Sequence, residues 1–425
     1  MITSEKKNIK DFFLLVIFLY LLSSELCKVY FGALPKAILC LFIGVEAVLF
    51  FCSIIHKKID VKYFYLFSMY YIYIIYNGVI FGNTTKMIMG YYQYIFYSFS
   101  FFLALYIIPN INIDWIFKIL SKVSILLSIL SFYEFFSNKL LLFTNNLLGV
   151  VLIGDEFVVR SRVFSESFLV WGLLLDFLAI INIYIYIKER KKIYIISAIL
   201  NIVAELTTSS RGPLMALALA IICYYFLYKF SKKFDKKDLL KTIVLVIFVL
   251  SFLIFIIFNE NFVTNNTLID YVLNRIRSIF NWDSSYSNLT RMSLWKNSFN
   301  LIKDNIWHGI GIASATSKLM NASTETIITE SGVLKIILET GIVGFLLYYS
   351  IIIGILIRGI KSLNKVRIID KNKLILSITI IITILIEDII LQCTESITIS
   401  FWLWFFLGNI FFITSNFEER EIKKI

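Results

Sequence analysis

Apolar runs of about 20 residues recur from one end of this 425-residue chain to the other. A helix rises about 1.5 Å per residue, so each run is long enough to cross a hydrocarbon core of about 30 Å. A closed barrel would need strands of about 10 residues with alternating polar and apolar side chains. Runs such as 243–257 show no alternation, and the chain is 59% hydrophobic and 16% charged. The sequence therefore predicts an all-α polytopic membrane protein.

We expect twelve transmembrane helices, separated by short polar segments. They are predicted at residues 12–27, 37–55, 63–81, 88–108, 115–136, 167–187, 193–206, 213–228, 242–258, 332–357, 374–392 and 397–414. The first run imitates a signal peptide, but no small-residue cleavage site follows it before Lys28, so we interpret it as a retained span. Residues 1–258 then carry nine spans, 259–331 form a large loop, and 332–425 hold three spans and a tail.

The net charge of +12 has a topological explanation, because lysines and arginines gather in short segments between the predicted spans. If the N-terminus lies in the cytoplasm, every strongly basic short loop falls on the cytoplasmic side, as the positive-inside rule requires. Both termini are therefore expected in the cytoplasm, and the loop 259–331 on the outer side. Nucleic acid is not an expected partner.

Two stretches of the outer loop carry apolar residues at helical spacing. The first runs from residue 269 to 280 and the second from 292 to 306. Both predict short amphipathic helices, and Asn305 with the glycines of the WHGIG run should end the second.

The sixth, eighth and tenth predicted spans all begin on the outer side, with charged residues at their N-termini. Arg160 and Arg162 precede the sixth span, Arg211 the eighth and Glu330 the tenth. Helix N-termini attract anions, and a guanidinium group fits phosphate oxygens. This arrangement predicts a pyrophosphate-binding site. The alternative is that each arginine lies at the interface or caps a turn.

Glu330 and His308 are candidates for handling protons. A carboxylate can take a proton from an attacking sugar hydroxyl, although Glu330 is also ordinary at a helix start, with Thr329 as a suitable N-cap. His308, in the run WHGIG, is the only histidine on the predicted outer side and is a candidate for acceptor binding.

Acidic residues also lie in or at the ends of the predicted spans, where they usually face the bundle interior or a wet cavity. They are Glu46, Glu134, Asp176, Glu205, Glu387, Asp388 and Glu395. They leave a transporter open as an alternative, although the spans near them lack the paired Gly/Pro breaks of inverted-repeat transporters. Lys335 and Glu339 are four residues apart in the tenth span and are expected to pair with each other.

Three segments carry a family resemblance between residues 155 and 350. They are RSRVFSESFLVWGLLL (160–175), TTSSRGPLMALALA (207–220), and TRMSLWKNSFNLIKDNIWHGIGIAS (290–314) followed by ESGVLKIILETGIVGFLLY (330–348). Their order and spacing resemble the bacterial O-antigen polymerase and ligase superfamily of membrane glycosyltransferases.

The resemblance implies a GT-C-like fold in the bacterial cytoplasmic membrane, and glycan transfer from a polyprenyl diphosphate carrier to another lipid-linked oligosaccharide on the outer face. It implies metal-independent chemistry without a cofactor. Expected partners are the lipid-linked donor and acceptor, the bilayer, a chain-length regulator and a flippase. Residues predicted to act are Glu330 and Arg211 in catalysis, with Arg160, Arg162, Arg291 and His308 in substrate binding.

One departure from the superfamily favours a polymerase over a ligase. Ligases usually have a histidine and asparagine pair where the outer loop re-enters the membrane, and this chain has Thr329, Glu330, Ser331 and Gly332 there. We therefore expect a polymerase of O-antigen, capsular or exopolysaccharide repeat units. A ligase remains an alternative, as does a flippase that would use acids such as Asp176 or Glu387 as proton relays.

Overall fold

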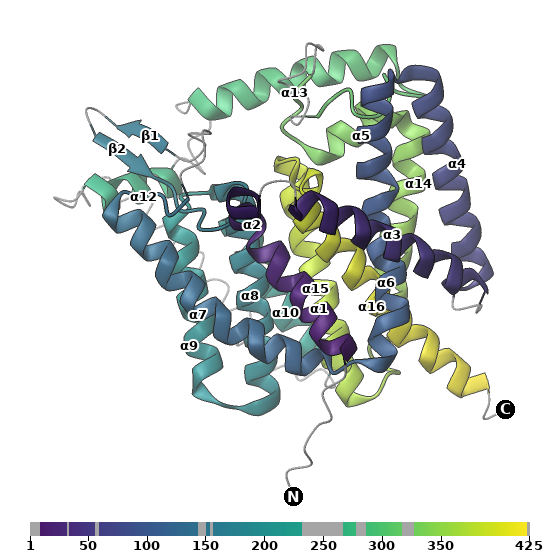
Figure 1. Ribbon diagram of the computed structural model, residues 1–425, viewed down its shortest axis with the longest axis horizontal. Coiled ribbons are helices and arrows are strands. Elements are labelled where there is room, and N and C mark those ends of the chain that lie inside the picture. Colours follow the sequence, from purple (N-terminus) through teal and green to yellow (C-terminus); the bar gives the residue numbers. More distant parts are fainter. Residues whose placement is uncertain are drawn as a thin grey trace, which may run out of the picture. The chain divides into compact units, whose positions relative to one another are not determined.

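The computed structural model describes residues 9–31, 34–55, 59–142, 150–153, 156–231, 267–277, 286–316 and 327–422. Within these ranges nearly all the chain is helical, which confirms the predicted helical class, whereas the GT-C-like fold remains a prediction (Figure 1). The ninth predicted span, 242–258, lies outside the described residues.

The helices follow the predicted spans closely. The first ten are α1 (Ile9–Leu22), α2 (Ser24–Phe31), α3 (Leu34–Ile55), α4 (Val61–Phe81), α5 (Thr84–Tyr94), α6 (Phe99–Ile107), α7 (Ile113–Ser137), α8 (Phe168–Glu189), α9 (Lys192–Thr207) and α10 (Arg211–Phe230). The later ones are α12 (Thr267–Arg277), α13 (Tyr286–Asp304), α14 (Gly332–Ser362), α15 (Ile368–Ile390) and α16 (Ile397–Ile422), with short 3-10 turns η1 (Phe96–Ser98), η2 (Ile108–Asn110) and η4 (Cys393–Glu395).

Seven stretches in the described part of the chain are long and apolar enough to cross a membrane. They are Val61–Phe81, Thr84–Asn110, Ile113–Ser137, Phe168–Glu189, Arg211–Phe230, Gly332–Ser362 and Ile397–Asn416. An eighth is formed if α1 and α2, which meet at 80°, are one broken span. The protein is thus a multi-pass membrane protein, and the total of twelve spans remains a prediction.

The first span was expected to be one helix, but it bends after Leu22. Ser23 interrupts it, and its hydroxyl donates a hydrogen bond of 2.7 Å to the carbonyl of Leu19. A serine that bonds back to the preceding turn often bends a helix.

The predicted outer loop before α8 holds a hairpin that the all-α expectation missed. Strands β1 (Val150–Ile153) and β2 (Glu156–Val159) pair antiparallel, with Val150 opposite Val159. The sequence VVLIGDEFVV places β-branched residues around a Gly-Asp pair, which is a hairpin signal that the long apolar spans obscured.

The chain forms two compact units, of which the first comprises Met1–Gly32, Asn112–Leu289 and Lys371–Thr379. Here α7, α8 and α9 pack against one another, and α10 packs on α8 (Figure 1). Buried serines form a column along one face of α7 and bond to polar residues of α8 and α9, including Ser124 to Ser197 at 3.0 Å and Ser128 to Asn201 at 2.7 Å. Small polar residues of this kind hold helices together in lipid.

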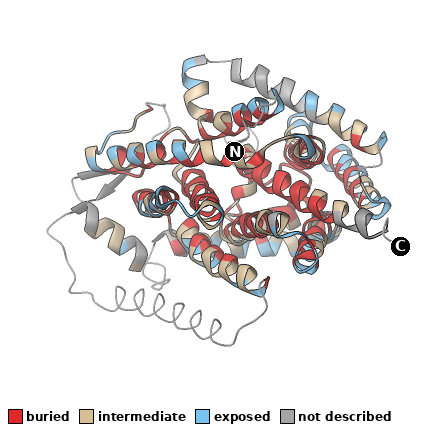
Figure 2. Cartoon of the chain, turned by 90° about the horizontal axis from the view of Figure 1, so that it is seen from below, coloured by how far each residue is buried: buried red, intermediate tan, exposed pale blue. Residues whose placement is uncertain are grey.

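The second unit comprises Ala33–Ile111, Thr290–Asp370 and Ile380–Ile425. In it α16 packs along α6 and α14, while α14 also packs on α4. Aromatic rings fill the core, among them Phe67, Phe101 and Trp404. Exposed apolar residues such as Ile72 and Val79 lie on α4, and Figure 2 shows buried and exposed residues on opposite sides of several helices. Such faces are expected against lipid acyl chains.

Candidate functional site

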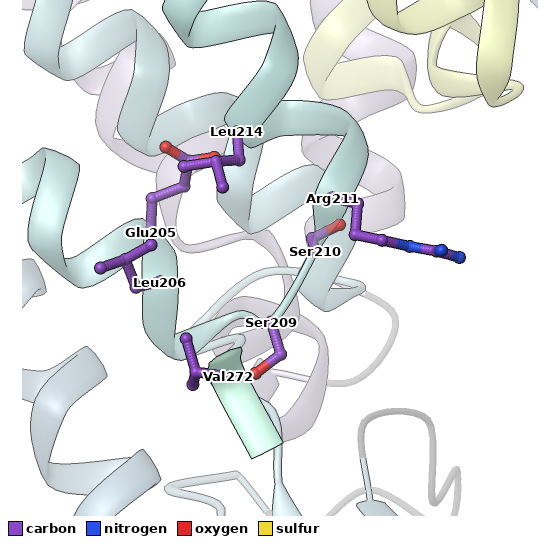
Figure 3. Close-up of a pocket in the computed structure, with 7 residues that line it drawn as sticks. All are labelled: Glu205, Leu206, Ser209, Ser210, Arg211, Leu214 and Val272. Atoms are coloured by element: carbon purple, nitrogen blue, oxygen red, sulfur yellow. The ribbon is translucent and has the colours of Figure 1, made fainter. Parts of the chain in front are cut away.

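Arg211 is the first residue of α10 and lines a pocket in the first unit. Ser210 precedes it in extended conformation, and Pro213 falls in the first turn, where a missing N–H costs nothing. The pocket is small and partly open to solvent, and its lining residues are Glu205, Leu206, Ser209, Ser210, Arg211, Leu214 and Val272 (Figure 3). In Figure 3 the Arg211 guanidinium extends away from the Glu205 carboxylate. This pocket therefore combines a helix N-terminus with a guanidinium group.

The loop helix α12 closes one side of this pocket. Val272 on α12 lies beside the turn that carries Ser209. The sequence predicted an amphipathic helix in this part of the outer loop, and α12 confirms the helix at residues 267–277.

Arg160 is buried and supports the turn before Arg211. Its Nε donates to the carbonyl of Thr208 at 2.8 Å, and its Nη2 donates to the carbonyl of Ser209 at 2.9 Å. The guanidinium also lies 3.4 Å from the centre of the Phe168 ring. Ser209 has a positive φ of 48°, which a non-glycine residue keeps only when its surroundings hold it. These contacts fit a positioning role for Arg160.

Arg162 is also buried, in a loop organised by one carboxylate. Glu134 accepts from the backbone N–H groups of Arg162, Val163 and Leu141 at 2.8–2.9 Å. Nη2 of Arg162 donates to the carbonyl of Leu142 at 3.1 Å. Glu134, one of the intramembrane acids, thus satisfies loop donors, and the described contacts give Arg162 a structural role too.

In the second unit, the WHGIG and ETGIVG segments interlock at a break in α14. Gly341 has φ 64° and ψ −175°, which interrupts the helix. The backbone N–H of Ile310 donates to Leu338 at 2.8 Å, that of Gly311 to Glu339 at 3.1 Å, and that of Ile342 to Ile306 at 2.8 Å. The loop thereby replaces hydrogen bonds that the broken helix lacks.

His308 lies in this interlocked segment, with an exposed side chain. Its carbonyl accepts from the Asn77 amide at 2.7 Å, and its ring lies 6.4 Å from the Phe81 ring, centre to centre. Asn77 also accepts from the backbone N–H of Ile312 at 2.9 Å, so α4 holds both ends of the turn. The imidazole remains open to a ligand from solvent.

Glu330 and Arg291, two of the predicted site residues, form an ion pair. Arg291 Nε lies 3.3 Å from Glu330 Oε2, and the two side chains are 18% and 36% exposed. Glu330 has a positive φ of 51° and stands just before α14. The predicted N-cap Thr329 is wrong, because α14 begins at Gly332 and Ser331 accepts from the N–H of Leu334. Thr329 instead donates to the carbonyl of Ser331 at 2.9 Å.

A buried polar cluster in the second unit includes Lys335 of α14, and the expected pairing of Lys335 with Glu339 is wrong. Lys335 Nζ donates to Gln93 at 2.8 Å and lies 3.7 Å from Glu395, which also accepts from Thr316. Glu339 accepts from the Tyr94 hydroxyl and the N–H of Ala315 at 2.6 and 2.8 Å. Tertiary partners replace the local pair.

Gln93 was missed by the sequence analysis, although a lone glutamine in the aromatic run YYQY could have signalled a buried polar contact. Its amide bridges Lys335 and Thr316, the latter at 3.2 Å. The charged residues inside spans were visible in the sequence, whereas their partners depend on which helices meet.

Residues 196–349 match a protein-family model described as O-antigen ligase. This match supports the resemblance of the chain to the O-antigen polymerase and ligase superfamily. The matched segment spans the turn before α10, the predicted outer loop and most of α14, and it contains Arg211, Arg291, His308 and Glu330. Arg160 and Arg162 precede it. None of the curated proteins matches the chain.

Proposed function

We propose that this protein polymerises polyprenyl-diphosphate-linked oligosaccharide repeat units of an O-antigen, capsule or exopolysaccharide on the outer face of the cytoplasmic membrane. The observation that carries the proposal is the Arg211 pocket, which lies within the segment that matches the O-antigen ligase family and combines a helix N-terminus with a guanidinium group. Both features favour the binding of an anion such as a diphosphate.

Transfer needs positive charge where the diphosphate leaves, because negative charge develops on its oxygens as the bond to the sugar breaks. In the first unit, Arg211 and the N-terminus of α10 supply that charge. Arg160 holds the turn before Arg211 in place, and Arg162 supports the neighbouring loop.

In the second unit, Arg291 binds phosphate oxygens and Glu330 takes the proton of the acceptor hydroxyl. When no substrate is bound, the carboxylate of Glu330 is paired with the guanidinium of Arg291 and is not available as a base. A diphosphate that binds Arg291 competes with Glu330 for the guanidinium, and it thereby releases the carboxylate to act as a base. The exposed ring of His308 contributes to acceptor binding.

The test is a gel of surface polysaccharide from a strain that lacks this protein, complemented with the wild type or with Arg211→Ala. We expect Arg211→Ala to lose the long-chain ladder while single repeat units still reach the outer face. Arg367→Ala is the matched control, because this exposed arginine pairs with Asp370 at the start of α15 and should leave the ladder intact.

Three other outcomes separate the alternatives. A normal ladder in Arg211→Ala would remove the catalytic assignment of this residue. Loss of all outward display of repeat units would indicate a flippase. Chains of unchanged length that are no longer joined to their anchor would indicate a ligase.

A further inference from the structure

Glu387 and Asp388 form a buried acid pair near the end of α15. Their side chains are 0% and 1% exposed. Asp388 Oδ1 accepts from the backbone N–H and the hydroxyl of Thr394 at 3.1 and 2.8 Å. Both carboxylate oxygens of Glu387 and the Oδ2 of Asp388 have no hydrogen-bond partner among the described residues. Three acceptor oxygens of two consecutive residues are therefore buried without donors in the part of the chain that the structure describes.

The acid pair faces the start of α14, next to the ion pair of the proposed site. A methyl group at Gly332 would collide with both carboxylate oxygens of Asp388, so Asp388 lies directly against this first helical residue. Gly332 follows Glu330 by two residues. Arg291 is close enough to Glu387 for its positive charge to act on that carboxylate. The three acids and the arginine thus gather at one place in the second unit.

Buried acceptors without donors are rare and costly, because a carboxylate that leaves water loses its hydrogen bonds. The guanidinium of Arg291 does not supply these donors, because it pairs with Glu330 and makes no hydrogen bond to the carboxylate of Glu387. A bound molecule with several hydroxyl groups would supply them. Neighbouring hydroxyls of a sugar are donors at the spacing that adjacent carboxylate oxygens can accept, and carboxylates accept such bonds strongly.

We propose that Glu387 and Asp388 bind hydroxyl groups of the acceptor sugar, beside Arg291 and Glu330. This inference rests on the proposed function, and it assigns to sugar binding two acids that the sequence left open as proton relays. This arrangement requires a glycine at position 332, because any side chain there would collide with Asp388 at the start of α14.

The experiment measures binding without catalysis. The probe is the free repeat-unit oligosaccharide, released by mild acid from the lipid-linked units of a strain that lacks this protein. The full-length protein in detergent is titrated with it, as wild type, Glu387→Gln and Asp370→Asn. Asp370 lies on the same helix at its opposite end, where it pairs with Arg367, and it serves as the control.

We expect Glu387→Gln to weaken oligosaccharide binding by tenfold or more, which is about the loss of one charge-assisted hydrogen bond. Asp370→Asn should bind like the wild type. Because Glu387 has no hydrogen-bond donor among the described residues, replacement by the neutral glutamine should leave the melting temperature equal to or above that of the wild type. A residue with a purely structural role would lower it.

Unchanged affinity in Glu387→Gln, or a wild type that does not bind the oligosaccharide, would overturn the sugar site. A marked fall in the melting temperature of Glu387→Gln would overturn it too. The Arg211→Ala ladder tests the function independently: its loss alongside unchanged Glu387→Gln binding rejects only the sugar site. A normal ladder alongside weakened binding removes the catalytic assignment of Arg211 and keeps the sugar site.

Discussion

Arg291 and Glu330 are bound to each other, at 3.3 Å between Nε and Oε2, although the sequence predicted substrate binding for Arg291 and catalysis for Glu330. Both side chains are partly exposed, and pairs of this kind contribute only about 0–1 kcal/mol to stability. The fold therefore does not depend on the pair. A substrate with a stronger negative charge can separate it.

Glu330→Gln should shorten or abolish the polysaccharide ladder while leaving the stability of the protein nearly unchanged. Loss of a general base slows transfer by about 10²–10⁴-fold, whereas loss of a partly exposed pair costs about 1 kcal/mol at most. Ladder gels and thermal unfolding in detergent measure the two effects. Glu25→Gln, which removes another partly exposed pair, with Lys28, is the control and should keep the ladder. A full ladder in Glu330→Gln would exclude this residue as the base.

Arg160→Lys should destabilise the protein by about 1–3 kcal/mol, because lysine cannot donate to two carbonyls at once or stack on a ring as a planar guanidinium does. The bonds at risk are those to Thr208 and Ser209, together with the contact over Phe168. Thermal unfolding measures the effect. A variant as stable as the wild type that fails to bind inorganic pyrophosphate would instead make Arg160 a direct phosphate ligand.

Gly341→Ala should be strongly destabilising. A side chain at φ 64° is strained by about 1–3 kcal/mol, and the added methyl would collide with the carbonyl of Trp307. Gly354→Ala in the same helix is the matched control, since its nearest neighbour atom is the Tyr63 hydroxyl at 3.4 Å, an ordinary contact. The control should be neutral or gain up to about 1 kcal/mol from better helix propensity. Equal unfolding temperatures for the two variants would show that Gly341 does not have the positive φ and the close contact with Trp307 described above.

The predicted orientation can be tested in a variant without its five native cysteines. Lys139→Cys, after α7, should react with a membrane-impermeant maleimide in intact cells. Lys192→Cys, at the start of α9, should react only after the membrane is permeabilised, because the basic loop before it is expected in the cytoplasm. Both lysines are exposed, so access to the reagent is decided by the membrane. The reverse labelling pattern would invert the topology.

Much of the fold could be predicted because hydrophobic length is a local property. The helix from Ile113 to Ser137 and the one from Phe168 to Glu189 lie within two residues of their predicted bounds. Helix ends also carried local signals, such as Pro213 in the first turn of α10. The bend after Leu22 and the β1–β2 hairpin were missed, because one serine or one Gly-Asp pair is a weak signal beside a long apolar run.

The sequence by itself determined the membrane class, the positions of the helices and the identity of the charged residues within them. It could do so because a backbone in lipid must make its hydrogen bonds internally, which leaves helices or closed barrels as the only spanning structures. The tertiary structure decided which of those charges meet. Arg160 donates to two backbone carbonyls, Lys335 contacts Gln93 and Glu395 instead of Glu339, and Glu387 is buried without a donor among the described residues. Each of these contacts joins residues far apart in the chain, so it depends on how the helices pack rather than on any local pattern.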